Sequence, residues 1–425
     1  MIRSGLPHTL PNSIWEKFQI ALVDRACEMR GIKTLLTTIT RRAWPLLLCA
    51  TILLAAACGN SAKATGGDEI RIRKNAKDLT EYEKWSYTDA IRQLKATPSP
   101  YSDTLNYYDF FVRLHQMAVQ LKTQRYIDSG CDDQGNFGIA HANPSFPPWH
   151  RKLLALYEDA LREVSGREVR LPYWDWTDAA STAATFAPDL MGGNGDPNDE
   201  WAVTDGPFQK GTFPLSLRTT MASFQGQNDY DHIVRNFAAT LPDLGLPGYP
   251  VSLPTTSQIE FAYSLTEYDV APYTPYADPD VSFRSYLEGF QNPLSSGQRM
   301  HNIGHDWIAG FFQVPVESLE FNTIVNGCQT TTVHNDTRAG SMEPLDVSPN
   351  DPAFFMHHAN VDRIWYVWQQ IGDNLYKYTN SGVQGQNLDD EMYPFDQFKG
   401  FPQMDARGYT PREMLNSDSM GVAYE

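Results

Sequence analysis

Apolar side chains recur every three to four residues in several stretches of this chain, which is the spacing of amphipathic helices. Residues 79–94 form one such stretch, and Thr80 followed by Glu83 predicts a capping box at its start. Residues 105–121 form a second, whose inward face consists of Tyr108, Phe111, Val112, His115 and Val119. The pattern therefore predicts two helices, the second with a histidine on its buried face.

Prolines place the start of a third helix. Pro144, Pro147 and Pro148 keep the chain extended and then release a helix near Trp149. A shorter helical group covers residues 300–307.

The most informative helix is predicted over residues 351–368. Asp351 can accept hydrogen bonds from free backbone amides, and the proline after it suits a first helical turn. The inward face carries His358 and Asp362 among apolar side chains. A core helix with one hydrogen-bonded histidine would show a similar pattern. The second histidine, His357, and the carboxylate one turn away favour a metal site instead.

The remaining sequence is dominated by loop-forming residues. Residues 187–274 are rich in Gly, Pro, Asn and Asp, and residues 312–350 also have the composition of a loop. Irregular stretches of this length inside a domain usually wall a functional site. We therefore expect a mainly α fold with long loops and a few short strands.

The N-terminal region has the pattern of an export signal. Arg41 and Arg42 precede an apolar run that is shorter than the ~20 residues needed to span a bilayer. We expect residues 1–57 to be an N-terminal extension and export signal that resembles twin-arginine signals, with translation starting at Met1 or Met29. The product would be periplasmic, attached to the cell surface or secreted.

The segment after the signal suggests a tether. Residues 58–78 are expected to connect the signal flexibly to a domain at 79–425. Cys58 follows a run that loosely resembles a lipoprotein cleavage box, so a lipid anchor is an alternative to release. Cys131 and Cys328 remain after export, and whether they pair as a disulfide stays open.

Composition and charge narrow the classes of partner. With 425 residues, 41% of them hydrophobic, the chain can bury a large core. Its formal net charge of -17 opposes binding to a phosphate backbone. Nucleic acid is therefore excluded as a partner.

Histidines supply the candidate chemistry. His301 and His305 are four residues apart, so they project from one helix face as a metal-binding pair can. They lack the Glu of zinc-protease HExxH motifs, and the Glu-x-x-His motifs of di-iron bundles are also missing. Two sets of three emerge: His115, His141 and His150, then His301, His305 and either His357 or His358. Three neutral imidazoles suit copper and leave coordination positions open.

Several motifs together resemble the tyrosinase family, and bacterial tyrosinases most of all. They are His141-Ala-x-Pro-Ser-Phe-x-Pro-Trp-His-Arg151, Leu190-Met-Gly-Gly-Asn-Gly195, Asp205-Gly-Pro-Phe208, Phe283-Arg-x-x-Leu-Glu-Gly289, His301-Asn302 and Ser348-Pro-Asn-Asp-Pro-x-Phe354 with the following histidine pair. The likeness covers about residues 80–425.

The resemblance implies a four-helix bundle that holds two type-3 copper ions, which bind molecular oxygen between them. It assigns His115, His141 and His150 to the first copper, and His301, His305 and His358 to the second. It places His357 beside the site, a choice that spacing alone leaves open.

The resemblance also implies roles for residues around the coppers. Glu288 and Asn302 would hold a water that deprotonates an incoming phenol, whose pKa near ~10 leaves little phenolate at neutral pH. Phe354 would pack on the imidazoles. Asp306, which with Gly304 flanks His305, would bias substrate choice, and Leu345 would lie near the site entrance.

Ile139 stands where fungal and plant relatives have a thioether-forming cysteine, so no such thioether can form here. Asp362 and Arg363 are expected to form structural salt bridges.

The expected activity follows from this resemblance. A dicopper oxidase would use oxygen to ortho-hydroxylate monophenols and to oxidise o-diphenols to o-quinones. A catechol oxidase or o-aminophenol oxidase with little monophenolase activity is the alternative, and an oxygen-binding haemocyanin-like protein is a further one. A separate copper-delivery helper protein is compatible with the sequence.

Overall fold

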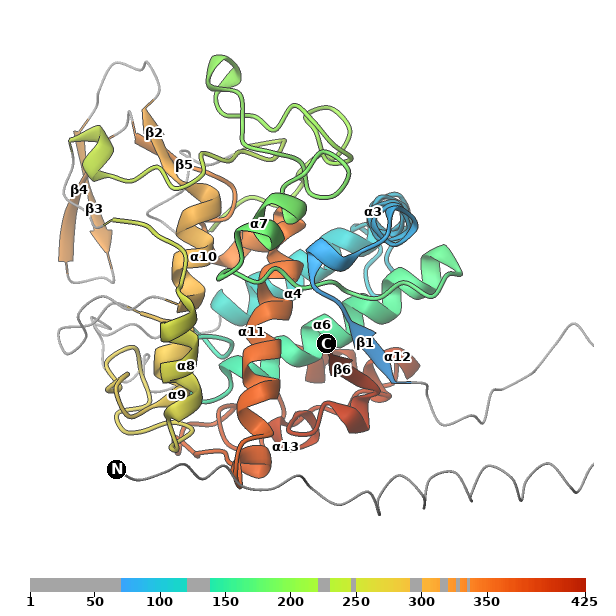
Figure 1. Cartoon of the computed structure of the whole chain (residues 1–425), viewed down its shortest axis with the longest axis vertical. Helices are drawn as coiled ribbons and strands as arrows, with labels where there is room; N and C mark the ends of the chain where they lie inside the picture. Colours follow the sequence, from blue (N-terminus) through green and yellow to red (C-terminus); the bar gives the residue numbers. More distant parts are fainter. Residues whose placement is uncertain are drawn as a thin grey trace, which may run out of the picture. The chain divides into compact units, whose positions relative to one another are not determined.

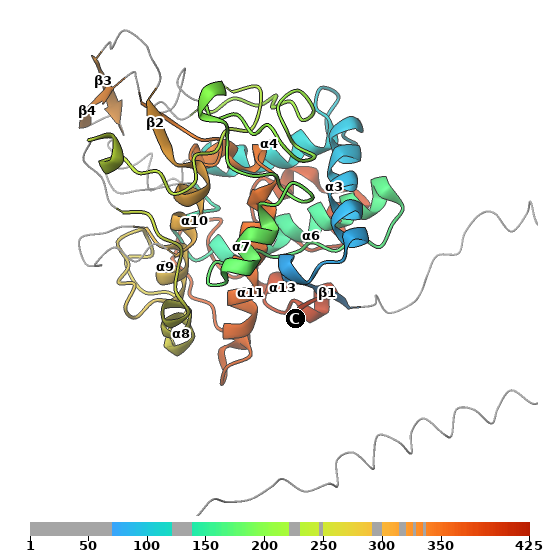
Figure 2. The same ribbon diagram turned by 45° about the horizontal axis from the view of Figure 1, so that its top comes forward.

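Most of the candidate histidines lie on four helices: α4 (Tyr107–Gln120), α6 (Phe146–Ser165), α10 (Met300–Ala309) and α11 (Ala353–Gln369). In the computed structural model, α11 runs through the middle of the molecule and contacts both α6 and α10 (Figure 1, Figure 2). The structure describes residues 70–120, 138–220, 230–245, 250–290, 300–313, 320–325, 329–334 and 337–425. As the sequence predicts, the described chain is mainly helical.

Helix starts follow the expected local chemistry, with small shifts. The capping box of α3 (Glu81–Ala96) forms, because Thr80 accepts from the Glu83 amide and Glu83 accepts from the Thr80 amide. Helix α6 begins at Phe146, three residues before the predicted start, because prolines are tolerated in a first turn whose amides have no helical partner. Helix α11 begins at Ala353, whose amide donates to Asp351 Oδ1 at 3.0 Å.

Short helices and turns make up much of the remainder. The helices are α7 (Ala179–Thr185), α8 (Thr256–Ser264), α9 (Phe283–Glu288), α12 (Pro402–Asp405) and α13 (Pro411–Met414). The 3-10 turns are η2 (Ala76–Asp78), η3 (Pro197–Asp199), η4 (Pro242–Leu244), η5 (Leu345–Asn350), η6 (Asn374–Tyr376), η7 (Phe395–Phe398) and η8 (Asp418–Met420). The expected loop over 187–274 is therefore interrupted mainly by α8.

Strands pair in three separate two-stranded sheets. Parallel β1 (Arg71–Arg73) and β6 (Val422–Tyr424) join the two ends of the described chain. Antiparallel β2 (Phe311–Gln313) pairs with β5 (Thr337–Ala339), and β3 (Glu320–Val325) pairs with β4 (Gln329–His334).

Two sequence expectations are corrected by these strands. The segment 312–350, expected to be loop, contributes β3, β4 and β5, because the loop-forming composition did not reveal its strand pairing. Residues 71–78, which the sequence analysis assigned to the tether, belong to the fold, because Arg73 is buried in a strand paired with β6. Only the part of the tether before Ile70 lies outside the described residues.

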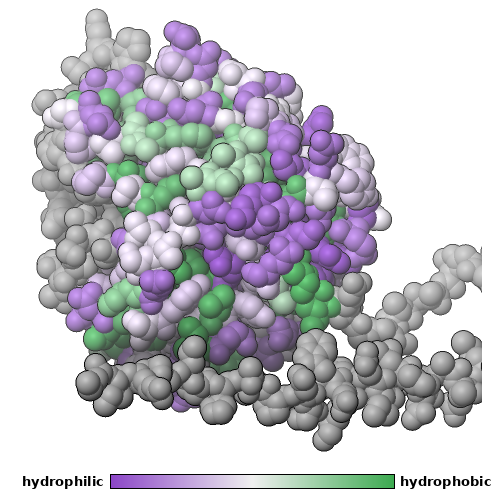
Figure 3. Space-filling model, viewed as in Figure 1, coloured by the Kyte–Doolittle hydropathy of each residue, from purple (hydrophilic) through white to green (hydrophobic). Residues whose placement is uncertain are grey.

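Other expectations concern residues that the structure does not describe. The export signal with Arg41 and Arg42, Cys58, and the cysteines Cys131 and Cys328 all lie outside the described ranges. Within the described ranges, no helix combines the length and the apolar character that a membrane crossing requires. Polar and apolar residues are interspersed on the face drawn in Figure 3.

Buried ion pairs fix the helices that carry the histidines. Arg235 donates to both carboxylate oxygens of Asp351, at 2.7 and 2.6 Å, and both side chains are fully buried. Arg235 also donates to the carbonyls of Met191 and Gly192. Asp351 thus holds the start of α11 and anchors a long loop to it.

We predict that Asp351→Asn destabilises the protein by about 3–5 kcal/mol, because it leaves the Arg235 guanidinium buried without its charge partner. The midpoint of urea unfolding of the metal-free protein, at unchanged m-value, measures this. Asp389→Asn is the matched control, because Arg412 binds both oxygens of Asp389 in the same geometry on the surface. A similar loss of stability in both variants would contradict the prediction.

Candidate metal centre

Three buried histidines from separate segments form the first group. His115 lies on α4, His150 on α6, and His141 on the loop that precedes α6. One nitrogen from each lies within 4.8 Å of the others. Their ring centroids are 4.9–5.6 Å apart. The fold brings this predicted set together.

The second group contains four buried histidines: His301 and His305 on α10, and His357 and His358 on α11. The Nε2 atom of His301 lies 3.1 Å from that of His358 and 3.0 Å from that of His305, and the third side of this triangle is 3.4 Å. A point between three atoms so spaced lies about 2 Å from each, the length of a zinc–imidazole bond.

The two groups share one interior. The rings of His150 and His358 stack at 4.3 Å, and those of His141 and His301 are 6.3 Å apart. The ring centroid of Phe354 lies 4.1 Å from that of His358 and 5.1 Å from that of His115. A second phenylalanine, Phe146, also lies between the two groups.

Phe146 received no role in the sequence analysis. Its ring is 4.9 Å from both His150 and His301, one histidine of each group. The signal was its place in the proline motif between His141 and His150, which fixes the start of α6.

Hydrogen bonds at Nδ1 orient several of the imidazoles. His115, His150 and His305 direct Nδ1 at backbone carbonyls of Asp346, Phe146 and Met342, at 3.3, 2.8 and 3.1 Å. A carbonyl only accepts, so each Nδ1 carries the proton and each Nε2 keeps a lone pair for a metal. His301 Nδ1 likewise faces Asn302 Oδ1 at 2.8 Å.

Burial keeps these imidazoles neutral. It lowers the pKa of His115 to about 3 and that of His305 to about 4, although a backbone carbonyl opposes the shift in each case. The pKa values of His141, His150, His301 and His358 are also lowered, first by burial and then by neighbouring histidines. Neutral imidazole is the form that binds metals.

His357 differs from the other members of its group. Its Nδ1 accepts a hydrogen bond from the indole N–H of Trp176 at 3.1 Å. Gly304 makes room for this ring, because a Cβ there would lie 2.1 Å from His357 Cε1. Trp176 lies in the aromatic segment at residues 171–176, but no local sequence pattern links it to His357.

Glu288 is fully buried beside the first group. Its Oε1 accepts from the Ala142 amide at 2.6 Å, directly after His141, and its Oε2 accepts from Arg284 at 3.0 Å. Burial raises the pKa of Glu288 to about 7 against the opposing effect of Arg284.

The other flanking residues take varied positions. Asp306 is buried, while Leu345 at the start of η5 is half-buried. Asp362 forms the expected structural salt bridges, at 2.6 Å with Arg151 and 3.3 Å with Arg73. Arg363 pairs separately with Asp175 at 2.9 Å.

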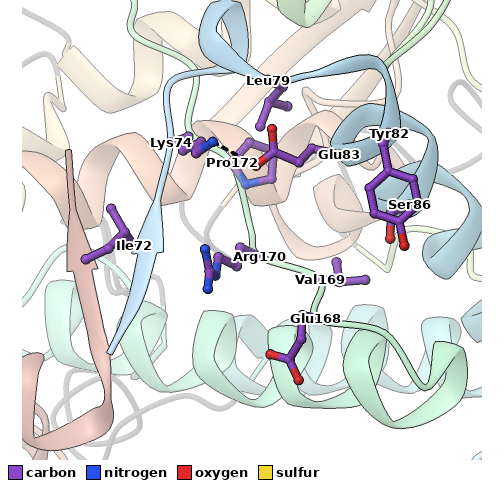
Figure 4. A pocket seen from close by; sticks show the side chains of 10 residues that line it. All are labelled: Ile72, Lys74, Leu79, Tyr82, Glu83, Ser86, Glu168, Val169, Arg170 and Pro172. Atoms are coloured by element: carbon purple, nitrogen blue, oxygen red, sulfur yellow. Dashed lines mark ion pairs between the residues drawn. The ribbon is translucent and has the colours of Figure 1, made fainter. Parts of the chain in front are cut away.

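A surface hollow between β1, α3 and the segment before Tyr173 lies apart from this centre (Figure 4). It is lined by Ile72, Lys74, Leu79, Tyr82, Glu83, Ser86, Glu168, Val169, Arg170 and Pro172. None of the seven clustered histidines borders it, so it is not the metal site.

The donor set fits copper. In the first group, the Nε2 atoms of His115, His141 and His150 are buried and have no hydrogen-bond partner among the described residues, and the same holds for His357 Nε2 in the second group. Unpaired buried polar atoms are rare because each costs about 1–3 kcal/mol. Clusters made wholly of imidazole, without carboxylate, suit copper and leave open positions.

Comparisons with known proteins agree with this geometry. Residues 105–371 match the model of the common central domain of tyrosinase. Grixazone synthase of Streptomyces griseus is 30% identical over 315 residues, covering 71% of this chain and 84% of the relative. A tyrosinase of Streptomyces antibioticus is 31% identical over 304 residues, with the same coverage of 71% and 84%.

Among solved structures, a mutant polyphenol oxidase of Thermothelomyces thermophila is 20% identical and covers 88% of this chain and 84% of its own, with a TM-score of 0.47. The family model spans more than half of the chain. The chain therefore belongs to the tyrosinase family, and it is a copper oxidoreductase with a type-3 dicopper centre.

Proposed function

We propose that this protein uses molecular oxygen to hydroxylate monophenols at the ortho position and to oxidise o-diphenols to o-quinones. The observation that carries the proposal is the buried pair of histidine groups beside Glu288, a carboxylate whose pKa is raised toward neutrality. The Streptomyces relatives named tyrosinase support the same reaction.

The ligand set that we propose contains six histidines. His115, His141 and His150 would hold the first copper, and His301, His305 and His358 the second. Helices α4, α6, α10 and α11 would then act as the four-helix bundle of this family. When bound, the two coppers supply oxygen binding and electron transfer.

Glu288 is the proposed base for the monophenol. Each carboxylate oxygen has more than one acceptor site, so the bonds from Ala142 and Arg284 leave capacity for a water or a phenol proton. Asn302 already accepts from His301 through Oδ1, which leaves its amide N–H groups to hold that water. The phenol would give up its proton as it approaches the centre.

The alternatives differ in how well the monophenol step runs. A catechol oxidase or o-aminophenol oxidase would need no efficient base. The ion pair with Arg284 stabilises the ionised form of Glu288 and so makes this carboxylate a weaker base, which favours these alternatives. An oxygen carrier of the haemocyanin kind would bind oxygen without turnover. The substrates that we propose are phenols and o-diphenols.

We further propose that the protein is exported, by a route like the twin-arginine pathway that uses Arg41 and Arg42. Lipidation at Cys58 and copper delivery by a helper protein are compatible extensions of this proposal.

We predict that His358→Gln lowers bound copper from two ions to about one per chain, because it removes one of three donors of the second copper. His357→Gln is the matched control and should retain both ions at saturating copper. Metal analysis by mass spectrometry measures both. Loss of copper in His357→Gln alone would show that the two adjacent histidines have been assigned the wrong way round.

We predict that Glu288→Gln slows monophenol hydroxylation by roughly 10²-fold and diphenol oxidation far less. The carboxylate is the basic form, so the parent rate should rise with pH as Glu288 ionises, from a pKa raised to about 7 by burial. That rise should be missing in the variant. Glu260→Gln, on the exposed side of α8, is the control. Equal rates of monophenol hydroxylation in Glu288→Gln and in the parent protein would show that Glu288 is not the base.

We predict oxygen uptake with tyrosine, dihydroxyphenylalanine and o-aminophenol alike in the copper-loaded protein. Uptake with the last two but not with tyrosine would replace the proposal with the catechol or o-aminophenol oxidase. Stoichiometric uptake without turnover on any of them would indicate an oxygen carrier.

A further inference from the structure

The hydrogen-bond partner at Nδ1 divides the buried histidines into two kinds. At His115, His150 and His305 the partner is a backbone carbonyl, and at His301 it is the Asn302 side-chain oxygen, so these partners accept. At His357 the partner is the Trp176 indole N–H, which can only donate. Nδ1 of His357 therefore accepts a hydrogen bond, whereas Nδ1 of each of the other four histidines donates one.

This difference fixes where the imidazole proton of His357 sits. A neutral imidazole has one N–H and one lone pair. Because Trp176 uses the lone pair of Nδ1, the proton must be on Nε2. His357 then offers no lone pair to a metal, whereas His115, His150 and His305 each keep one on Nε2.

Distance alone would not keep His357 out of the metal site. Its candidate ligand atom lies within 4.8 Å of those of His301, His305 and His358. Its ring lies 5.0 Å from that of His301 and 4.7 Å from that of His305. Gly304 admits the ring to this position, since any Cβ there would overlap it.

We propose that Trp176 is a positioning residue that withholds His357 from the second copper, so that three histidines bind the ion and a coordination position stays open for oxygen or substrate. The inference rests on the ligand set proposed above. Without the indole N–H, His357 could carry its proton on Nδ1 and present the Nε2 lone pair as a fourth donor. An extra nitrogen ligand would occupy the position that the reaction needs.

The first test uses the metal-free protein. Nitrogen-15 NMR of the imidazoles distinguishes a protonated from an unprotonated ring nitrogen, and loss of one signal set in His357→Gln assigns His357. In the parent, we expect its proton on Nε2. In Trp176→Phe, which keeps an aromatic ring but removes the N–H, we expect the Nδ1–H form to appear. A proton on Nδ1 in the parent would overturn the proposal, and this result requires no variant of Trp176 to fold.

Trp174→Phe is the matched control. Trp174 lies in the same segment with its ring 6.0 Å from that of His357, but its indole N–H donates to Thr182. It should leave the His357 proton on Nε2. Movement of the proton in both variants, or in neither, would contradict the role of the Trp176 N–H.

The second test uses the copper-loaded protein. In Trp176→Phe we expect unchanged copper content, a higher average number of nitrogen ligands by X-ray absorption, and a kcat at least about tenfold lower. A merely structural role would lower copper content without adding a ligand. Failure of the ligand set itself would appear separately, as two coppers retained in His358→Gln.

Discussion

The structure depends on one costly arrangement, the burial of seven imidazoles in a common interior. Several of their nitrogens lack a hydrogen-bond partner within the described chain, which costs folding free energy until a metal uses their lone pairs. Burial also lowers their pKa values, so they stay neutral and available. Metal binding and folding are therefore coupled in this protein.

Buried ion pairs fix the positions of the helices around these rings. Asp351 fixes the start of α11 through Arg235, and Asp362, one turn after His358, ties α11 to Arg151, the residue after His150. The Asp362–Arg151 pair thus joins α11 to α6, the helices that carry His358 and His150. Phe146 and Phe354 fill the space between the rings with apolar surface.

Sequence patterns predicted the parts of this site that depend on local chemistry. Helical spacing identified His115, His301 and His305 as inward-facing, and the Thr80 capping box and the Asp351 helix start follow from short-range hydrogen bonding. The β1–β6 pairing and the Trp176–His357 bond join residues that are far apart in the chain, so neither leaves a local pattern. For the same reason, the pairing of Glu288 with Ala142 could not be anticipated.

The direct test of this account is the number and kind of metal ions in the intact protein after incubation with excess copper and removal of unbound metal. Native mass spectrometry of the parent protein should show two copper ions per chain, retained together. A single ion, or preferential retention of zinc from an equal mixture, would contradict the assignment of two three-histidine copper sites.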